Sequence, residues 1–192
     1  MKHPLTERWT PMSPQLARMD LDQYHRMRDT GILHDGDPIE LLDGLLIYKD
    51  RSARGEGLMT VGKHHNLAVQ LLIEWAQEVR RRGCVLQVQG PVAIPPSHEP
   101  EPDGAILRGA LRDYADGLPE ARDVFCVIEV ADSSLAQDRT VKLSLYAQAA
   151  VPCYLIVNLV DHVVERFDDP IPAEGRYGRK SVLTRDEVVV LT

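Results

Sequence analysis

Apolar and polar residues recur along this chain with two different periods, and these periods predict its elements. The clearest helix spans residues 62–82, where apolar side chains return every three or four positions. A shorter helix is predicted to begin after Asp20, a good N-cap residue, and to continue through Arg28 until Gly31 ends it. Residues 138–149 are predicted to form a third helix.

Short apolar runs predict the strands. Residues 39–42 and 45–48 flank the dipeptide Asp43-Gly44, which is a strong hairpin signal. Residues 124–130 (VFCVIEV) are almost continuously apolar, as expected of a central strand that is covered on both faces. Further strands are expected at residues 84–88, 91–94, 105–107, 154–157, 162–167, 180–183 and 188–191.

The order of these elements predicts an α/β fold in which helices flank a mixed central sheet. The strand, helix and strand between residues 124 and 157 have the pattern of a crossover connection between neighbouring strands. Residues 1–19, which contain three prolines, are interpreted as an N-terminal arm on a single domain of residues 20–192. Residues 50–60 are interpreted as a mobile loop.

Composition narrows the class of protein. Of the 192 residues, 44% are hydrophobic and 27% are charged, so wholesale disorder is excluded. No apolar run approaches the roughly 18 residues of a membrane helix, and the N-terminus lacks the apolar core of a signal peptide. The 3 cysteines form no C-x-x-C pair, which indicates reduced thiols in a cytoplasmic protein. No membrane is expected as a partner.

The formal net charge of −7 argues against a protein that grips nucleic acid mainly through a basic surface. It leaves open a local basic groove, and it leaves open a metal site built from carboxylates. Lysine is scarce in this chain, so a lysine inside an ordered element is a candidate for a specific task.

Three features could carry chemistry. Asp103 lies directly before a predicted strand, Glu129 lies near the end of a buried one, and Asp138 precedes Lys142 by one helical turn. A carboxylate at a buried strand end costs about several kcal/mol to desolvate unless it is paired or binds a metal. Two such carboxylates can hold a hard divalent cation, typically Mg²⁺, which could activate a water, while a nearby ammonium steadies the developing charge.

The same residues also have a structural interpretation. Glu129 would pair with Lys142 or an arginine in a buried bridge, Asp103 would be a turn residue after proline, and Asp138 would cap a helix. Spacing alone slightly favours this structural interpretation.

The sequence of residues 128–170, from IEVADSS through DRTVKLSLYAQAAVP to RFDDP, resembles the Uma-two family of proposed restriction endonucleases. That family lies within the PD-(D/E)XK nuclease superfamily. Upstream, IELLDGLL resembles its first hairpin, KHHNLAVQLL its histidine-led helix and EPDGAIL its P-D strand. The resemblance covers roughly residues 20–170, and it implies a restriction-endonuclease-like core and a Mg²⁺- or Mn²⁺-dependent endonuclease that acts on DNA.

The resemblance also implies site residues. Asp103 and Glu129 would be the metal-binding carboxylates. The usual lysine lies two residues after the glutamate, but this chain has Ala131 there, so Lys142 on the following helix would replace it.

Accessory residues follow from the same motifs. Glu40 would be an additional acidic residue near the site, or else an ordinary strand-edge charge. His64 matches the family's helix histidine and would contact the site or a phosphate, or else only begin its helix. Asp138 belongs to the D-x-x-x-K pattern, and Tyr146 lies one turn beyond Lys142, where it would pack or orient the lysine.

The leading hypothesis is therefore a Mg²⁺-dependent DNA endonuclease, with a homodimer expected by analogy with the fold. A non-catalytic module that keeps the nuclease fold for binding or assembly is the second hypothesis. A hydrolase of another phosphoester is the third, and it would need a closed pocket rather than an open basic cleft. Arginines around the site, for which the candidates are Arg51, Arg54, Arg108 and Arg139, would separate the first hypothesis from the third.

Overall fold

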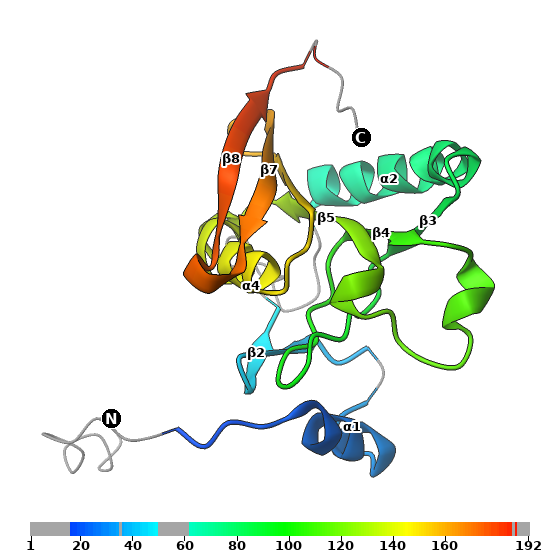
Figure 1. Cartoon of the computed structure of the whole chain (residues 1–192), viewed down its shortest axis with the longest axis vertical. Coiled ribbons are helices and arrows are strands. Elements are labelled where there is room, and N and C mark those ends of the chain that lie inside the picture. Colours follow the sequence, from blue (N-terminus) through cyan, green and yellow to red (C-terminus); the bar gives the residue numbers. More distant parts are fainter. Residues whose placement is uncertain (1–15, 35, 50–61, 186, 188–192) are drawn as a thin grey trace, which may run out of the picture.

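The computed structural model describes residues 16–34, 36–49, 62–185 and 187 (Figure 1). The helices are α1 (Leu21–Asp29), α2 (Lys63–Arg81), α3 (Leu135–Gln137) and α4 (Leu143–Gln148), and a π-helical turn, Asp138–Lys142, joins α3 to α4. The strands are β1 (Ile39–Leu42), β2 (Leu45–Tyr48), β3 (Cys84–Val88), β4 (Gly104–Arg108), β5 (Val124–Ala131), β6 (Cys153–Asn158), β7 (Val163–Ile171) and β8 (Arg176–Leu183).

The larger sheet has six strands in the order β3-β4-β5-β6-β7-β8, and β1 and β2 form a separate hairpin. Its neighbouring strands are antiparallel except for β5 and β6, which are parallel. Parallel neighbours need a crossover, and the chain from α3 to α4 supplies it, as the sequence predicts. The predicted mixed sheet flanked by helices is therefore confirmed.

Two apolar layers hold this sheet between α2 and α4, which Figure 1 shows on opposite sides of it. Alternate residues of each strand face opposite layers. On β5, Cys126, Ile128 and Val130 pack in the layer that contains Val69 and Leu72 of α2. The other layer contains Val127 and Ala131 of β5 together with Leu145 and Tyr146 of α4. Glu129 lies between Val127 and Ala131 in β5, so its side chain shares their face, the α4 side of the sheet.

The N-terminal helix and hairpin form where the sequence predicts them. Asp20 caps α1 by accepting a hydrogen bond from Gln23 N at 2.8 Å. The β1–β2 turn is Asp43-Gly44, and both residues have positive φ. Figure 1 shows α1 and β2 below the larger sheet. The hairpin is tied to the segment before β4, because Glu99 N donates to Leu41 O at 2.7 Å.

Several expected boundaries are corrected by the structure. Residues 91–94 form no strand, and Ala93 and Ile94 make only isolated bridges. Pro91 begins this segment and Pro95 follows it, and proline lacks the N–H that a ladder needs. The helix expected at residues 138–149 begins earlier, at Leu135, and contains the π turn, where Tyr154 Oη donates to Asp138 O at 3.1 Å.

Some expectations lie outside the described residues. They concern the loop at residues 50–60, the strand at residues 188–191 and nearly all of the N-terminal arm. Among the described residues, no helix is both long and apolar enough to cross a membrane. Cys84, Cys126 and Cys153 are free thiols.

Candidate active site

A cavity of about 360 Å³ opens where β4 begins and β5 ends. The last pair between β4 and β5 at this end is Gly104 with Ile128. The next residues are Asp103, directly before β4, and Glu129 of β5. The hairpin, the first turn of α2 and the crossover helix complete the wall. The charged or titratable side chains that line the cavity are Glu40, Lys49, His65, Glu101, Asp103, Glu129, Asp132 and Lys142.

Glu129 is almost completely buried, with 3% of its surface exposed. Its Oε1 accepts hydrogen bonds from Lys142 Nζ at 3.0 Å and from Tyr146 Oη at 2.9 Å. Burial raises the pKa of Glu129 to about 8, since the attraction of Lys142 only partly opposes the loss of water. The nearby carboxylates of Asp138, Asp103 and Glu40 raise the pKa further.

Lys142 is the cation at the centre of this cluster. Its Nζ lies 3.0 Å from Glu129, 3.7 Å from Glu40 and 3.9 Å from Asp138. Burial by itself would lower the pKa of Lys142, but these three carboxylates outweigh it and hold the pKa above its ordinary value. One ammonium therefore faces three carboxylates, so the carboxylates of this cluster outnumber its described cations.

Asp103 has a different environment although it is the neighbouring carboxylate. Its Oδ2 is bonded by Val130 N at 2.9 Å and by His65 Nε2 at 3.2 Å, and its Oδ1 accepts from Gln89 Nε2 at 3.4 Å. Burial opposes the charged form, but His65 and the Val130 amide outweigh it and lower the pKa of Asp103. The pKa values of the two strand-end carboxylates are thus shifted in opposite directions.

The structure decides where the accessory residues lie. Glu40 is 1% exposed, and its Oε2 accepts from Glu101 N at 3.3 Å, so it is not a strand-edge charge. Asp138 is equally buried, with its Oδ2 bonded by Ser134 Oγ at 2.6 Å. Tyr146 is bonded to Glu129, the carboxylate that also holds Lys142.

His64 does not line the cavity, which agrees with the alternative that it only begins its helix. His64 is exposed, whereas His65 lines the cavity and contacts Asp103. Each helical residue is rotated by about 100° from the last, so only one of two adjacent histidines can face the sheet. His65 precedes the buried Val69 by four residues, and this spacing is a sequence signal that could have selected it.

Sequence reasoning also missed a second lysine. Lys49 follows β2, lines the cavity and forms an ion pair with Glu101. No local pattern predicts this pairing, because the two residues are 52 positions apart in the chain.

The candidate arginines do not rim the cavity in the described part of the chain. Arg108 is at the opposite end of β4 from Asp103 and stacks over Phe125, and Arg139 pairs with Glu165. Arg51 and Arg54 lie outside the described residues.

The donor set fits a hard divalent cation. Within the described ranges, no three His, Cys, Asp or Glu side chains converge as a complete metal cage. Mg²⁺ does not require one, because it commonly binds one or two carboxylates and keeps waters and substrate phosphates as its other ligands. Asp103 Oδ1 keeps acceptor capacity beside its bond to Gln89. The buried Asp138 Oδ1 has no hydrogen-bond partner, but Asp138 does not line the cavity.

Comparisons with known proteins show the family and the fold of the chain. A family model for Uma2, described as "Putative restriction endonuclease", matches residues 21–192. A crystal structure of a "putative nuclease belonging to DUF820" from Anabaena variabilis aligns with a TM-score of 0.61 and 12% identity, covering 90% of this chain and 88% of that one. At this identity the likeness shows the fold. No curated protein matches the chain.

Proposed function

Because this chain belongs to the Uma2 family, we propose that it is a nuclease that hydrolyses phosphodiester bonds in DNA with the help of Mg²⁺ or Mn²⁺. The observation that carries the proposal is the pairing of strand-end carboxylates beside a buried lysine. Asp103 and Glu129 face one cavity from neighbouring strands, and Lys142 lies 3.0 Å from Glu129.

In this proposal Asp103 and Glu129 hold the cation. A bound divalent cation would polarise the phosphate and lower the pKa of a water molecule. Lys142 positions the attacking water and stabilises the negative charge that develops on the phosphate. The usual strand position is Ala131, which is fully buried, and the π turn brings Lys142 to the same carboxylate from the crossover helix.

Glu40, Asp138 and Tyr146 are positioning residues in this proposal. Glu40 and Asp138 approach the Lys142 ammonium from the hairpin and from its own helix. Tyr146 donates to the Glu129 oxygen that also accepts from Lys142, so it restrains the direction of the carboxylate. DNA is the proposed partner, and a homodimer would place two such sites on two strands.

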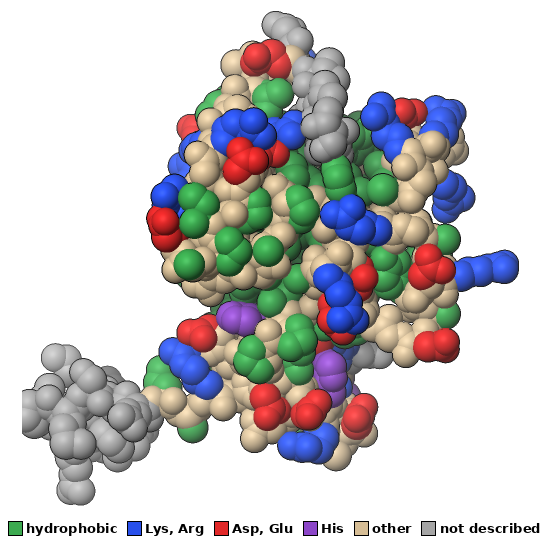
Figure 2. Space-filling view, in the orientation of Figure 1, with side chains coloured by type: hydrophobic (Ala, Val, Ile, Leu, Met, Phe, Trp, Pro, Cys, Tyr) green, Lys and Arg blue, Asp and Glu red, His purple; other side chains and the backbone are tan. Residues whose placement is uncertain are grey.

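A binding or assembly module with the nuclease fold is the alternative. Two observations favour it: the net charge is −7, and Figure 2 shows Lys and Arg in separate patches among other residues on the face in view. A hydrolase of a smaller phosphoester is a separate, third candidate. It is favoured over a nuclease of duplex DNA because neither Arg108 nor Arg139 lines the cavity.

Titration calorimetry with Mg²⁺ and Mn²⁺ tests the proposal, with and without a DNA duplex. We expect wild type to bind and both Asp103→Ala and Glu129→Ala to lose binding. Glu174→Ala is the matched control, because it removes a half-exposed surface carboxylate that does not line the cavity. A folded wild type that binds no metal at millimolar concentration, even with DNA, would favour the binding module.

A further inference from the structure

The Lys49–Glu101 ion pair lies on the cavity wall formed by the hairpin. Lys49 is the first residue after β2, and its backbone is fixed because its N donates to Pro38 O at 2.8 Å. Its Nζ contacts Glu101 Oε2, and the two side chains are 14% and 21% exposed. Both line the same cavity as the strand-end carboxylates. Glu101 N also donates to Glu40, so this pair is continuous with the acidic cluster.

The charges that line the cavity are unsuited to an anionic substrate unless a cation is available. Among the described residues, two lysines, Lys49 and Lys142, line the cavity. Lys142 is 8% exposed and is already shared among three carboxylates. The lining carboxylates are Glu40, Glu101, Asp103, Glu129 and Asp132. Lys49 is therefore the lysine that a phosphate entering the cavity can reach without disturbing the Glu129 cluster.

We propose that Lys49 binds a phosphate oxygen of the substrate backbone and that Glu101 is the anion that holds this ammonium while the site is empty. The proposal rests on the proposed function, because it assigns a substrate contact to the same cavity. An ammonium has three N–H donors and no fixed planar geometry, so a phosphate can replace or share the carboxylate. Both partners are anions, and a charge-assisted hydrogen bond is retained in either state.

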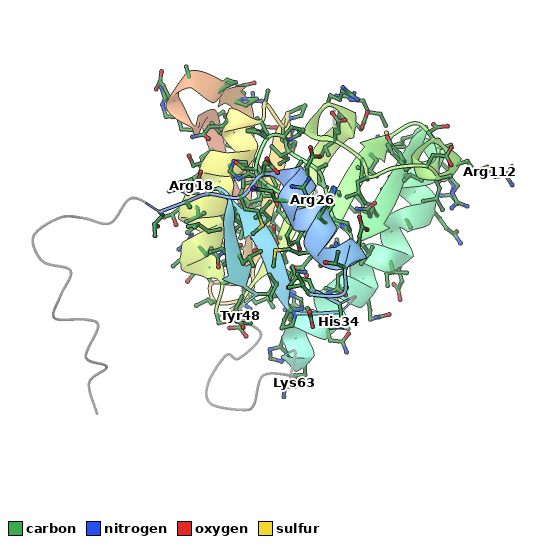
Figure 3. The ribbon with its side chains drawn as sticks, turned by 90° about the horizontal axis from the view of Figure 1, so that it is seen from below. Arg18, Arg26, His34, Tyr48, Lys63 and Arg112 are labelled. Carbon is green, nitrogen blue, oxygen red and sulfur yellow. The ribbon has the colours of Figure 1, made fainter. Side chains whose placement is uncertain are left out.

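The place of Lys49 in the molecule agrees with this role. Figure 3 shows its neighbour Tyr48 and the helix-start residue Lys63 toward the same edge of the molecule, with Arg112 at a distant side. Tyr48 is 71% exposed, and Gly62, which precedes Lys63, lines the cavity. Lys49 thus directly follows an exposed residue and lines the cavity itself, so it can meet a backbone that enters from this edge.

Substitutions of Lys49 and Glu101 are expected to change DNA affinity in opposite directions. This contrast distinguishes substrate binding by Lys49 from a purely structural ion pair. We measure binding of a fluorescein-labelled DNA strand and of its duplex by anisotropy at several salt concentrations, with Ca²⁺ in place of Mg²⁺ to slow cleavage. Lys49→Met is expected to raise Kd about tenfold, the effect of one charged hydrogen bond, and to reduce the salt slope by about one. Glu101→Gln is expected to lower Kd by about two- to threefold, because it removes an anion that competes with phosphate for Lys49.

Two further variants complete the design. Lys49→Arg keeps the charge and should bind within about threefold of wild type, which also covers the case in which Lys49→Met does not fold. Arg112→Met removes one positive charge from an exposed site far from Tyr48 in Figure 3 and should leave Kd nearly unchanged. Thermal melting of each variant reports whether the hairpin remains docked.

The outcomes are distinguishable. Weaker binding in both Lys49→Met and Glu101→Gln, with both melting temperatures lowered, would identify a structural bridge and overturn the inference. DNA binding by wild type that Lys49→Met leaves unchanged would overturn this inference alone. Loss of Mg²⁺ binding in Glu101→Gln would make Glu101 a metal ligand and overturn its role as counterion. A wild type that binds no DNA would overturn the proposed function and this inference with it.

Discussion

Glu129 and Glu165 are two buried glutamates on the same face of the sheet, and they differ in the balance of positive and negative side chains around them. They lie on β5 and β7 on either side of Ile156, which pairs with both. Their exposed fractions are 3% and 1%. Each is bonded by a cation from the π-helical turn, Glu129 by Lys142 and Glu165 by Arg139.

The two carboxylates nevertheless have opposite pKa shifts. Burial would raise the pKa of Glu165, but hydrogen bonds from Arg139, Lys180 and Asn158 outweigh it and lower the pKa to about 2. Burial raises the pKa of Glu129 to about 8, because one lysine is shared with neighbouring carboxylates. Burial alone therefore does not decide the pKa of a carboxylate, because the charges and hydrogen bonds around it also contribute.

This difference separates a structural cluster from a candidate active site. Around Glu165 the protein supplies two cations of its own, Arg139 and Lys180. Among the described residues around Glu129, one lysine faces three carboxylates, which is the condition in which an external cation stabilises the site. The four predictions that follow substitute one glutamate at a time, to break or to sharpen this comparison.

The largest expected effect is on cleavage. Glu129→Gln should lower the rate of DNA cleavage by about a thousandfold, since it replaces a proposed metal-binding carboxylate by an amide. Glu165→Gln should leave the rate within about twofold of wild type. Cleavage of a labelled oligonucleotide with Mg²⁺ or Mn²⁺ measures both. Equal losses in the two variants would contradict a distinction between the two clusters.

Stability should show the reverse order. Glu165→Gln should lower the free energy of unfolding by about 1–2 kcal/mol, because Arg139 and Lys180 lose a charged acceptor but remain partly exposed to water. Glu129→Gln should change it by less than about 1 kcal/mol, since the amide oxygen can still accept from Lys142 and Tyr146. Urea denaturation measures both values. A larger loss in Glu129→Gln would identify Glu129 as the structural residue.

Metal should stabilise the folded protein only through the cluster around Glu129. At a Mg²⁺ or Mn²⁺ concentration about five times Kd, the free energy of unfolding of wild type should rise by about 1 kcal/mol. Glu165→Gln should keep this increase, and Glu129→Gln should lose it. Thermal melting with and without metal is the measurement, and EDTA is the control. A metal-dependent increase that survives in Glu129→Gln would place the cation elsewhere.

The smallest effect concerns acid pH. The folded pKa of Glu165, about 2, is below its ordinary value of 4.5, so its stabilisation is complete above pH 4.5 and is lost as the pH falls toward 2. The melting temperature of wild type should therefore fall toward that of Glu165→Gln below pH 4.5. Calorimetric melting from pH 7 to pH 3 tests this. A constant difference between the two proteins across that range would exclude Glu165 as the titrating group.

Much of the fold follows from local patterns. The hairpin around Asp43-Gly44, the helix from residue 63 and the apolar strand that carries Glu129 all lie where the sequence predicts them. Local patterns failed where a non-local partner was required. Residues 91–94 are apolar enough for a strand, yet they form only isolated bridges with Glu120 and His98.

The candidate site divides in the same way. Asp103, Glu129 and Lys142 can be selected from the sequence, and they do line one cavity. The spacing of four residues to the apolar Val69 could have selected His65 over His64, and His65 is the one that contacts Asp103. Lys49 needs the position of the hairpin, which no local pattern contains.

The sequence by itself determined the elements, their order, the crossover between β5 and β6, and the type of carboxylate and lysine chemistry, because periodicity, capping and turn residues act within a few positions of each other. Only the tertiary structure decided which charges meet. It brings Lys49, which follows the hairpin, to Glu101 before β4, it brings Glu40 of the hairpin to the Lys142 ammonium, and it assigns Arg139 to Glu165. The physical reason is that charge interactions depend on separation in space and on burial, and both are set by packing between distant segments.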